Sequence, residues 1–242
     1  MPTVKPRAIP IQAPPGDTPM CGTTRQLPVA HRLLEHNDSL AATNRQRFHN
    51  AGVRVLNLLS SPGSGKTALL ECLAAAPPPS ALPGPMAVLV GDLATSLDAR
   101  RLQAAGLVAL PLHSGQACHL EASMVARGVD ALEAEGVALA DLAWLVIENV
   151  GNLVCPAAYD LGEELRLVLL SVTEGEDKPL KYPAMFRSAD VVVITKIDLA
   201  DAVSFDRSAA LAAIARVAPQ AAVVEVSARS GEGIGRLVDL CR

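Results

Sequence analysis

Aromatic side chains are scarce in this sequence of 242 residues, which contains one Trp, two Tyr and three Phe. Half of the residues are nevertheless hydrophobic. The core must therefore be built mainly from Leu, Val, Ile and Ala, and this composition suits a parallel β-sheet that helices cover on both faces. The chain is long enough for one sizeable α/β domain and short for two.

An excess of positive charge and a long apolar run are also missing. The 21 basic and 25 acidic side chains give a net charge of −4. No basic stripe alternates with aromatic residues, so we expect no nucleic-acid partner. No apolar stretch is long enough to cross a bilayer, and the first residues do not follow the order of a secretory signal. We therefore expect a cytoplasmic protein without a membrane partner.

Cysteines are few, odd in number and widely spread. This pattern argues against disulfides and favours metal binding or plain burial. The five cysteines are Cys21, Cys72, Cys118, Cys155 and Cys241. Cys72 lies within an apolar helical run, so we expect it in the core.

The chain divides by composition into a tail and a domain. Residues 1–28 hold seven prolines and few apolar residues, which predicts a flexible tail. Residues 29–242 follow as one nucleotide-binding domain, and its first segment, 29–50, has the spacing of an amphipathic helix. Seven apolar runs then predict strands, and helical stretches alternate with them. The runs are residues 53–59, 86–91, 107–112, 144–148, 166–172, 190–195 and 222–227. The alternation predicts an α/β fold with a mostly parallel sheet and a ligand at the carboxyl ends of its strands.

Residues 58–67, LLSSPGSGKT, form a phosphate-binding loop between the first strand and a helix. In this arrangement Lys66 reaches the β and γ phosphates and Thr67 offers a hydroxyl to Mg²⁺. Ser60 stands where the general pattern has Gly, which we interpret as a family variant. A plain Gly/Ser turn is the alternative, but strand, loop, GKT and helix occur here together. The residues expected to bind the nucleotide are Gly63, Ser64, Gly65, Lys66, Thr67 and Ala68.

Two acidic residues end strands at the edge where the triphosphate would lie. Asp92 would hold Mg²⁺ or orient the attacking water, and its alternative is a helix cap. Glu148 would bind Mg²⁺, and the N–H of Gly151 would contact the γ-phosphate. The expected catalytic residues are therefore Lys66, Asp92 and Glu148. Thr95 and Asp98 resemble a capping box, so we expect a structural role for Asp98.

The run VVVITKID resembles the guanine-specificity motif NKxD of G proteins. Asp198 would accept hydrogen bonds from guanine, Lys196 would lie along the base, and Thr195 replaces the usual Asn. Ser227 and Ala228 resemble the later loop whose backbone contacts guanine. An ATP-dependent small-molecule kinase is an alternative, and Thr195 and Asp198 argue against it.

Cys118, His119 and Cys155 are candidate ligands of a soft or borderline metal ion. Cys118 follows a turn and is expected to open a helix, whose N-terminus would lower the pKa of the thiol. Neighbours on a helix point about 100° apart, so such a site would need a distorted helix end or a second subunit. Cys155 lies shortly after Gly151, where loss of the γ-phosphate would move it. Burial in the core is the alternative for all three.

Three further stretches go beyond a generic G domain, namely HSGQACHLE at 113–121, IENVGNLVCPAAYDLGE at 147–163 and LSVTEGEDKPLKYPAMF at 170–186. With the motifs above, they resemble the HypB family, GTPases that assist nickel insertion into NiFe hydrogenase. The resemblance spans about residues 30–240 and also indicates relatives such as UreG and the chaperones of cobalamin-dependent mutases.

The resemblance implies a metallochaperone that hydrolyses GTP with Mg²⁺ and binds Ni²⁺ or Zn²⁺ at Cys118, His119 and Cys155. It implies a GTP-dependent homodimer, with the nickel chaperone HypA and the hydrogenase large subunit precursor as partners. Lys178 or Lys181 would reach the nucleotide of the second subunit. A conformational switch that assists a metalloenzyme without transferring metal stays open as an alternative. Many HypB proteins carry an N-terminal CxxCGC nickel site, and with only Cys21 in that region we expect no such site here.

Overall fold

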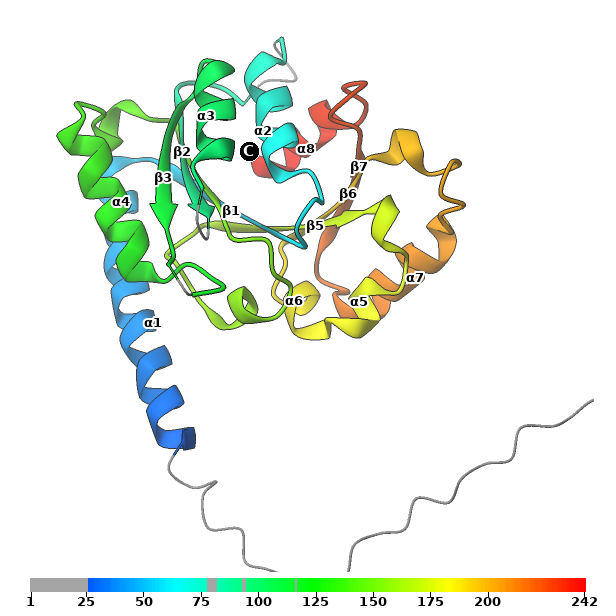
Figure 1. The fold of residues 1–242 in the computed structure, drawn as a ribbon, viewed down its shortest axis with the longest axis horizontal. Coiled ribbons are helices and arrows are strands. Elements are labelled where there is room, and N and C mark those ends of the chain that lie inside the picture. Colours follow the sequence, from blue (N-terminus) through cyan, green and yellow to red (C-terminus); the bar gives the residue numbers. More distant parts are fainter. Residues whose placement is uncertain (1–25, 78–81, 93–94, 116) are drawn as a thin grey trace, which may run out of the picture.

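One all-parallel sheet of seven strands forms the centre of the structure, in the order β3-β2-β4-β1-β5-β6-β7 (Figure 1). The computed structural model describes residues 26–77, 82–92, 95–115 and 117–242. The strands are β1 Arg54–Ser60, β2 Met86–Asp92, β3 Val108–His113, β4 Trp144–Glu148, β5 Leu165–Ser171, β6 Val191–Thr195 and β7 Ala222–Val226. All seven predicted strands are therefore present, and the predicted α/β fold is confirmed.

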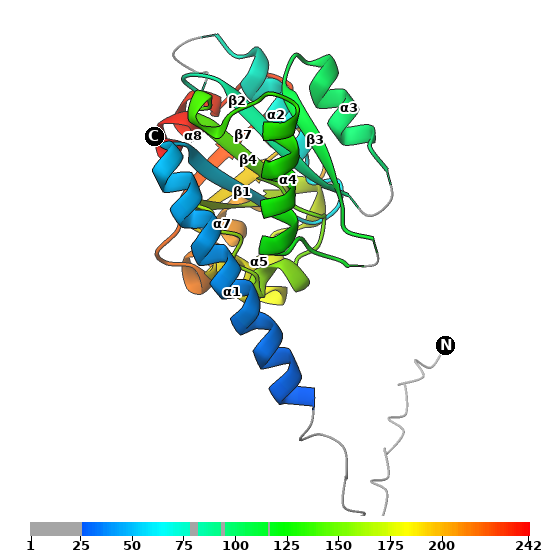
Figure 2. The same ribbon diagram turned by 90° about the vertical axis from the view of Figure 1, so that its left-hand side faces the viewer.

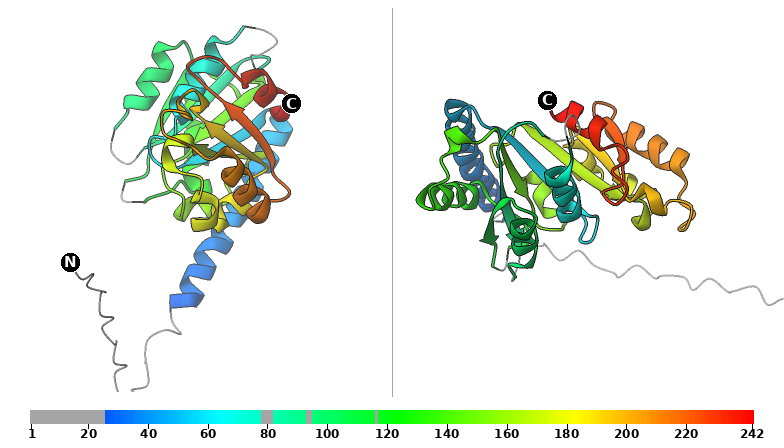
Figure 3. Two further views of the ribbon diagram at one scale, coloured as in Figure 1. Left: turned by 90° about the vertical axis from the view of Figure 1, so that its right-hand side faces the viewer. Right: turned by 90° about the horizontal axis from the view of Figure 1, so that it is seen from above.

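Helices cover both faces of this sheet (Figures 1 and 3). The helices are α1 Gln26–Ala51, α2 Lys66–Ala75, α3 Leu97–Ala104, α4 Ala122–Ala134, α5 Lys178–Lys181, α6 Pro183–Arg187, α7 Arg207–Val217 and α8 Ile234–Cys241. Short 3₁₀ turns are η1 Leu139–Asp141, η2 Cys155–Ala158, η3 Val172–Glu174 and η4 Ile197–Leu199. Because the central strands are buried on both sides, they are mostly aliphatic and show little alternation of polar and apolar residues.

The first face packs against α2, α3 and α8 in one hydrophobic cluster. Leu56 and Leu58 of β1 point into this cluster, together with Leu69 of α2 and Leu102 of α3. Cys241 of α8 is buried in the same cluster, and Cys72 packs against it half-buried. The expectation of a core position for Cys72 agrees with this packing.

The opposite face carries two separate clusters. One joins α1 and α4 to Val55, Leu89 and Ile147, and the other joins α6 and α7 to Val168 and Ile194. Asn57 of β1 is fully buried and belongs to neither apolar cluster. Asn57 donates to Glu163 at 3.0 Å and accepts from Asn149, the residue that follows β4, at 3.3 Å, so this face also holds buried polar contacts.

Helix α1 packs on α4 with its C-terminal part, while its N-terminal part extends away from the body of the molecule (Figure 2). The helix begins at Gln26, slightly before the expected Val29, and Pro28 falls in its first turn, where a missing N–H costs nothing. Residues 1–25 of the expected tail, including Cys21, lie outside the described residues. None of the helices that the structure describes is long and apolar enough to cross a membrane.

Candidate nucleotide and metal site

The phosphate-binding loop lies between β1 and α2 at the centre of the sheet. Gly65 adopts a φ of 98°, a left-handed conformation that favours glycine, and α2 begins directly after it at Lys66. The ammonium of Lys66 is buried, donates to the hydroxyl of Ser60 at 3.1 Å, and has its pKa lowered by that burial. Ser60, at the position of the usual Gly, therefore provides a hydrogen-bond partner for the lysine of the loop.

A cavity of about 490 Å³ opens in front of this loop. Residues from the loop, from β2 and from the segment after β4 line it, among them Gly63, Gly65, Lys66, Thr67, Ala68, Asp92, Glu148 and Gly151. Ser64 is buried beside it; its N–H donates to the carbonyl of Ser61 and its hydroxyl donates to Glu174. Two segments far apart in the sequence thus form the walls of one polar cavity.

Thr67 and Glu148 meet at the floor of the cavity. The hydroxyl of Thr67 donates to Oε1 of Glu148 at 2.8 Å, while Oε2 is buried with no hydrogen-bond partner among the described residues. Burial raises the pKa of Glu148 to about 6, although the charge of Lys66 acts against this. An orphaned carboxylate oxygen, a hydroxyl and the nearby Asp92 are the hard oxygen ligands that suit Mg²⁺.

The predicted capping box is wrong. Helix α3 has Ser96, and not Thr95, at its N-cap with no side-chain cap bond, and the hydroxyl of Thr95 donates to the carboxylate of Asp92. Asp98 lines the phosphate cavity instead and pairs with Arg101 at 3.3 Å. Arg101 also lines the cavity and is held by Glu71 of α2 at 2.7 Å. Sequence reasoning missed Arg101, since no motif marks it and only the packing of α3 beside α2 brings it there.

A second cavity, of about 220 Å³, adjoins the first and shares Gly65, Ala68 and Lys196 with it. Thr195, Lys196, Asp198 and Ala228 line it. Thr195 donates to the carbonyl of Ser64 at 2.7 Å, and Lys196 donates to the carbonyl of Gly63 at 2.7 Å. These bonds tie the TKID segment to the phosphate loop.

Asp198 is exposed at the rim of this second cavity and is oriented by a buried neighbour. The hydroxyl of Ser227 donates to Oδ1 of Asp198 at 2.6 Å. The serine thus orients the carboxylate and leaves its second oxygen for another donor.

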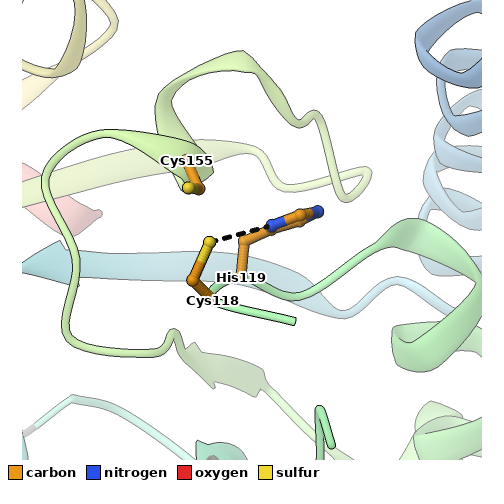
Figure 4. A group of neighbouring side chains, drawn as sticks. All are labelled: Cys118, His119 and Cys155. Carbon is orange, nitrogen blue, oxygen red and sulfur yellow. Dashed lines mark hydrogen bonds between the residues drawn. The ribbon is translucent and has the colours of Figure 1, made fainter. Parts of the chain in front are cut away.

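Cys118, His119 and Cys155 come together within a single chain (Figure 4). One ligand atom from each residue lies within 4.8 Å of the other two, and Cys118 Sγ lies 3.8 Å from His119 Nδ1. All three residues are half-buried. Two sulfurs and one imidazole nitrogen form three sides of a site that suits Zn²⁺ or Ni²⁺.

The expectation that Cys118 opens a helix is wrong. Helix α4 begins only at Ala122, because Asn37 of α1 accepts a hydrogen bond from the N–H of Ala122 at 2.9 Å and sets the helix start there. Cys118 and His119 lie in the preceding bend, so both side chains can point to one side. The pKa of the Cys118 thiol is raised, chiefly by its hydrogen bond with Cys155, rather than lowered by a helix.

The ring of His119 is held by its surroundings. It stacks on Tyr159 with 3.8 Å between the ring centroids, and burial lowers its pKa. Nε2 is buried without a hydrogen-bond partner among the described residues and lies 3.8 Å from a carboxylate oxygen of Glu121. The other nitrogen, Nδ1, is therefore the one that faces the two thiols. His113 is exposed at the end of β3.

Lys178 and Lys181, the two lysines expected to contact a second subunit, differ in their surroundings. Lys178 lines a cavity with Pro62, Gly151 and Tyr182, and its ammonium lies 5.4 Å from the ring centroid of Tyr182. Lys181 is exposed and pairs with Asp177. Only Lys178 therefore faces the segment after β4.

Comparison with known proteins agrees with this geometry. Residues 54–225 match the family model described as CobW/HypB/UreG, nucleotide-binding domain. The chain is similar to the hydrogenase maturation factor HypB of Azotobacter chroococcum mcd 1, with 48% identity over 221 residues, covering 90% of this chain and 68% of the relative. It is 45% identical over 210 residues to the factor of the same name from Escherichia coli K12, covering 87% of this chain and 70% of that one.

Solved structures show the same similarity. The chain resembles HypB from Helicobacter pylori in complex with nickel, with a TM-score of 0.79, 42% identity, and coverage of 84% of this chain and 92% of that one. The signal recognition particle 54 kDa protein from Aeropyrum pernix K1, in complex with GDP, has a TM-score of 0.51 at 15% identity. The second likeness extends to the fold alone.

Proposed function

The chain belongs to the HypB family of the CobW/HypB/UreG nucleotide-binding domains, and we propose that it is a GTP-hydrolysing metallochaperone that assists nickel insertion into NiFe hydrogenase. One observation carries the proposal. The segment that lines the phosphate cavity with Glu148 and Gly151 continues directly into Cys155, a member of the thiol and imidazole cluster. A change at the γ-phosphate would therefore alter the separation of the metal ligands.

The nucleotide in this proposal is GTP. Asp198 would accept from the paired donors of guanine, with Thr195, Lys196, Ser227 and Ala228 around the base. The phosphates would lie against the N–H groups of residues 63–68 and the ammonium of Lys66. The N–H of Gly151 would meet the γ-phosphate.

Hydrolysis would use Lys66, Asp92 and Glu148. Mg²⁺, held by Thr67, Asp92 and Glu148, would neutralise the charge of the phosphate oxygens. Asp92 would orient the attacking water, and Lys66 would stabilise the charge that develops on the phosphates. Arg101 lines the same cavity but is paired with Glu71 and Asp98, so turnover should be slow.

The cargo is Ni²⁺ or Zn²⁺, bound as a substrate by Cys118, His119 and Cys155. Three ligands leave a tetrahedral ion one ligand short, and a second copy of the chain would supply further ligands in a GTP-dependent homodimer. Lys178 is the residue we expect at the nucleotide of the second copy. Expected partners are the nickel chaperone HypA and the hydrogenase large subunit precursor, in the cytoplasm.

A Ni²⁺ titration tests the proposal. The protein is loaded with GDP or with a non-hydrolysable GTP analogue, and bound metal and molecular mass are read together, with Cys118→Ser as the control. We expect the analogue to produce a dimer with altered nickel affinity, and Cys118→Ser to abolish the binding. If nickel binding ignores both nucleotide and Cys118, the alternative of a conformational switch without metal transfer takes its place.

A further inference from the structure

The two halves of the metal cluster are connected to the nucleotide site in different ways. Cys155 follows Gly151 along the chain, so the backbone itself can move it. Cys118 and His119 lie in the loop after β3, far from Gly151 in sequence. If only the backbone carried the signal, one ligand would move and the other two would stay in place.

Asn152 bridges this gap. Its Nδ2 donates to the carbonyl of Cys118 at 3.2 Å, and its Oδ1 accepts from the N–H of Val154 at 2.8 Å. The preceding Gly151 packs so closely on the phosphate loop that an added Cβ would lie 2.8 Å from Cα of Pro62. Any displacement of Gly151 away from the loop would therefore carry Asn152 with it, and Asn152 would pull on Cys118.

Asn149 fixes the other end of the same loop. Its side chain is 2% exposed, and its Oδ1 accepts from the N–H of Leu120 at 3.3 Å and from Val150 at 2.9 Å. Its Nδ2 donates to Asn57 of the central strand at 3.3 Å. Leu120 is thus anchored to the sheet, while Cys118 is attached to the segment after Gly151. Motion of that segment would change the position of Cys118 relative to the anchored end of its loop.

We propose that Asn152 is a positioning residue through which the state of the nucleotide reaches Cys118, so that both thiols of the metal site respond together. The inference rests on the proposed function and adds a specific residue to it. Asparagine suits the role because its amide donates to Cys118 and accepts from Val154 at the same time. An aspartate would keep the bond from Val154 and lose the one to Cys118.

The test compares the Ni²⁺ affinity of the full chain loaded with GDP and with a non-hydrolysable GTP analogue. The proteins are wild type, Asn152→Ala, Asn152→Asp and the control Asn50→Ala, which removes an exposed asparagine whose side chain accepts from its helix neighbour Gln46. We expect the ratio of the two affinities to fall by about fivefold in both Asn152 variants, the equivalent of one hydrogen bond. The control should keep the wild-type ratio.

A second readout is the thiolate-to-metal absorption of the Co²⁺-loaded protein. In wild type it should differ between the two nucleotide states, and in Asn152→Ala this difference should shrink while Co²⁺ still binds. The negative charge of Asn152→Asp acts on the metal in both nucleotide states. The ratio of the two Ni²⁺ affinities therefore still reports the coupling between the nucleotide and the metal site. If Asn152→Ala does not fold, Asn152→Asp alone still tests the role of Asn152.

The possible results separate the two proposals. If wild type shows a ratio and both Asn152 variants keep it, the role of Asn152 is wrong and the proposed function stands. If wild type binds Ni²⁺ with equal affinity in both states, no coupling exists for Asn152 to carry, and the role is wrong. If wild type binds no Ni²⁺, both the metallochaperone function and this role are overturned.

Discussion

Thr67 donates a hydrogen bond of 2.8 Å to Oε1 of Glu148, while the second oxygen of that carboxylate is buried without a hydrogen-bond partner in the part of the chain that the structure describes. Ionising this buried carboxylate is costly, because its negative charge is shielded from water. The positive charge of Lys66 offsets only part of that cost, and the pKa of Glu148 stays raised at about 6. The nucleotide site is thus built with an unfavourable charge that a bound cation would relieve.

Glu148→Gln should stabilise the nucleotide-free protein, and the gain should depend on pH. The folded-state pKa of about 6 exceeds the ordinary 4.5, so the ionised group destabilises the fold above pH 6 and ceases to do so below 4.5. This difference corresponds to about 2 kcal/mol. Urea unfolding at pH 8 and pH 4.5 measures it, with a larger gain expected at pH 8. An effect that is the same at both pH values would contradict the raised pKa.

Asp198→Asn should lower GTP affinity by about 10- to 100-fold, because a hydrogen bond to a charged group contributes about 1.5 to 3 kcal/mol. ATP affinity should change little, since adenine lacks the matching pair of donors. Competition against a fluorescent guanine nucleotide measures both. Asp201→Asn is the matched control, an exposed acid a short way along the chain. Equal affinity of the wild type for ATP and GTP would contradict the assignment.

The sequence predicted the elements whose signals are local. Aliphatic residues predominate in every strand, and the phosphate loop is marked by the glycines and Lys66 that its geometry requires. The grouping of Cys118, His119 and Cys155 was expected from the resemblance, while residue spacing alone favoured core burial. The structure brings the three ligand atoms together without a second subunit, because the residues before Ala122 are not helical.

Most of the errors arose where a distant side chain decides local structure. The start of α4 depends on Asn37, which lies in α1 and accepts from the N–H of Ala122. The capping box failed for a local reason, because the hydroxyl of Thr95 bonds to Asp92, three residues earlier, and not to the helix. Arg101 enters the phosphate cavity through the packing of α3 on α2. A single sequence cannot show which of two available partners a polar group will choose.

Gly151→Ala should impair nucleotide discrimination more than folding. The new Cβ would lie 2.8 Å from Cα of Pro62, so the segment or the phosphate loop must shift, at a cost of about 1 to 3 kcal/mol in unfolding free energy. Because Gly151 lines the phosphate cavity, affinity for a GTP analogue should fall more than affinity for GDP. Calorimetric titration with both nucleotides checks this. An equal loss for the two would mean that Gly151 does not sense the γ-phosphate.

The four described cysteines should differ in their reactivity toward a thiol reagent at pH 8. Burial raises the pKa of Cys241 to about 11, so only about one thiol in a thousand is ionised there, and the side chain is also shielded from solvent. Cys72, Cys118 and Cys155 are half-buried and should all react before Cys241. Ni²⁺ should then protect Cys118 and Cys155 and leave the rate at Cys72 unchanged.

Alkylation with N-ethylmaleimide, followed by peptide mass spectrometry, resolves each position. His119→Ala is the informative variant, because it keeps both thiols and removes the third ligand, so protection should require more Ni²⁺. Urea should expose Cys241 and equalise the rates, which shows that its low reactivity belongs to the fold. Protection of Cys72 by nickel, or labelling of Cys241 as fast as Cys155, would place the metal elsewhere or contradict the packing of α8.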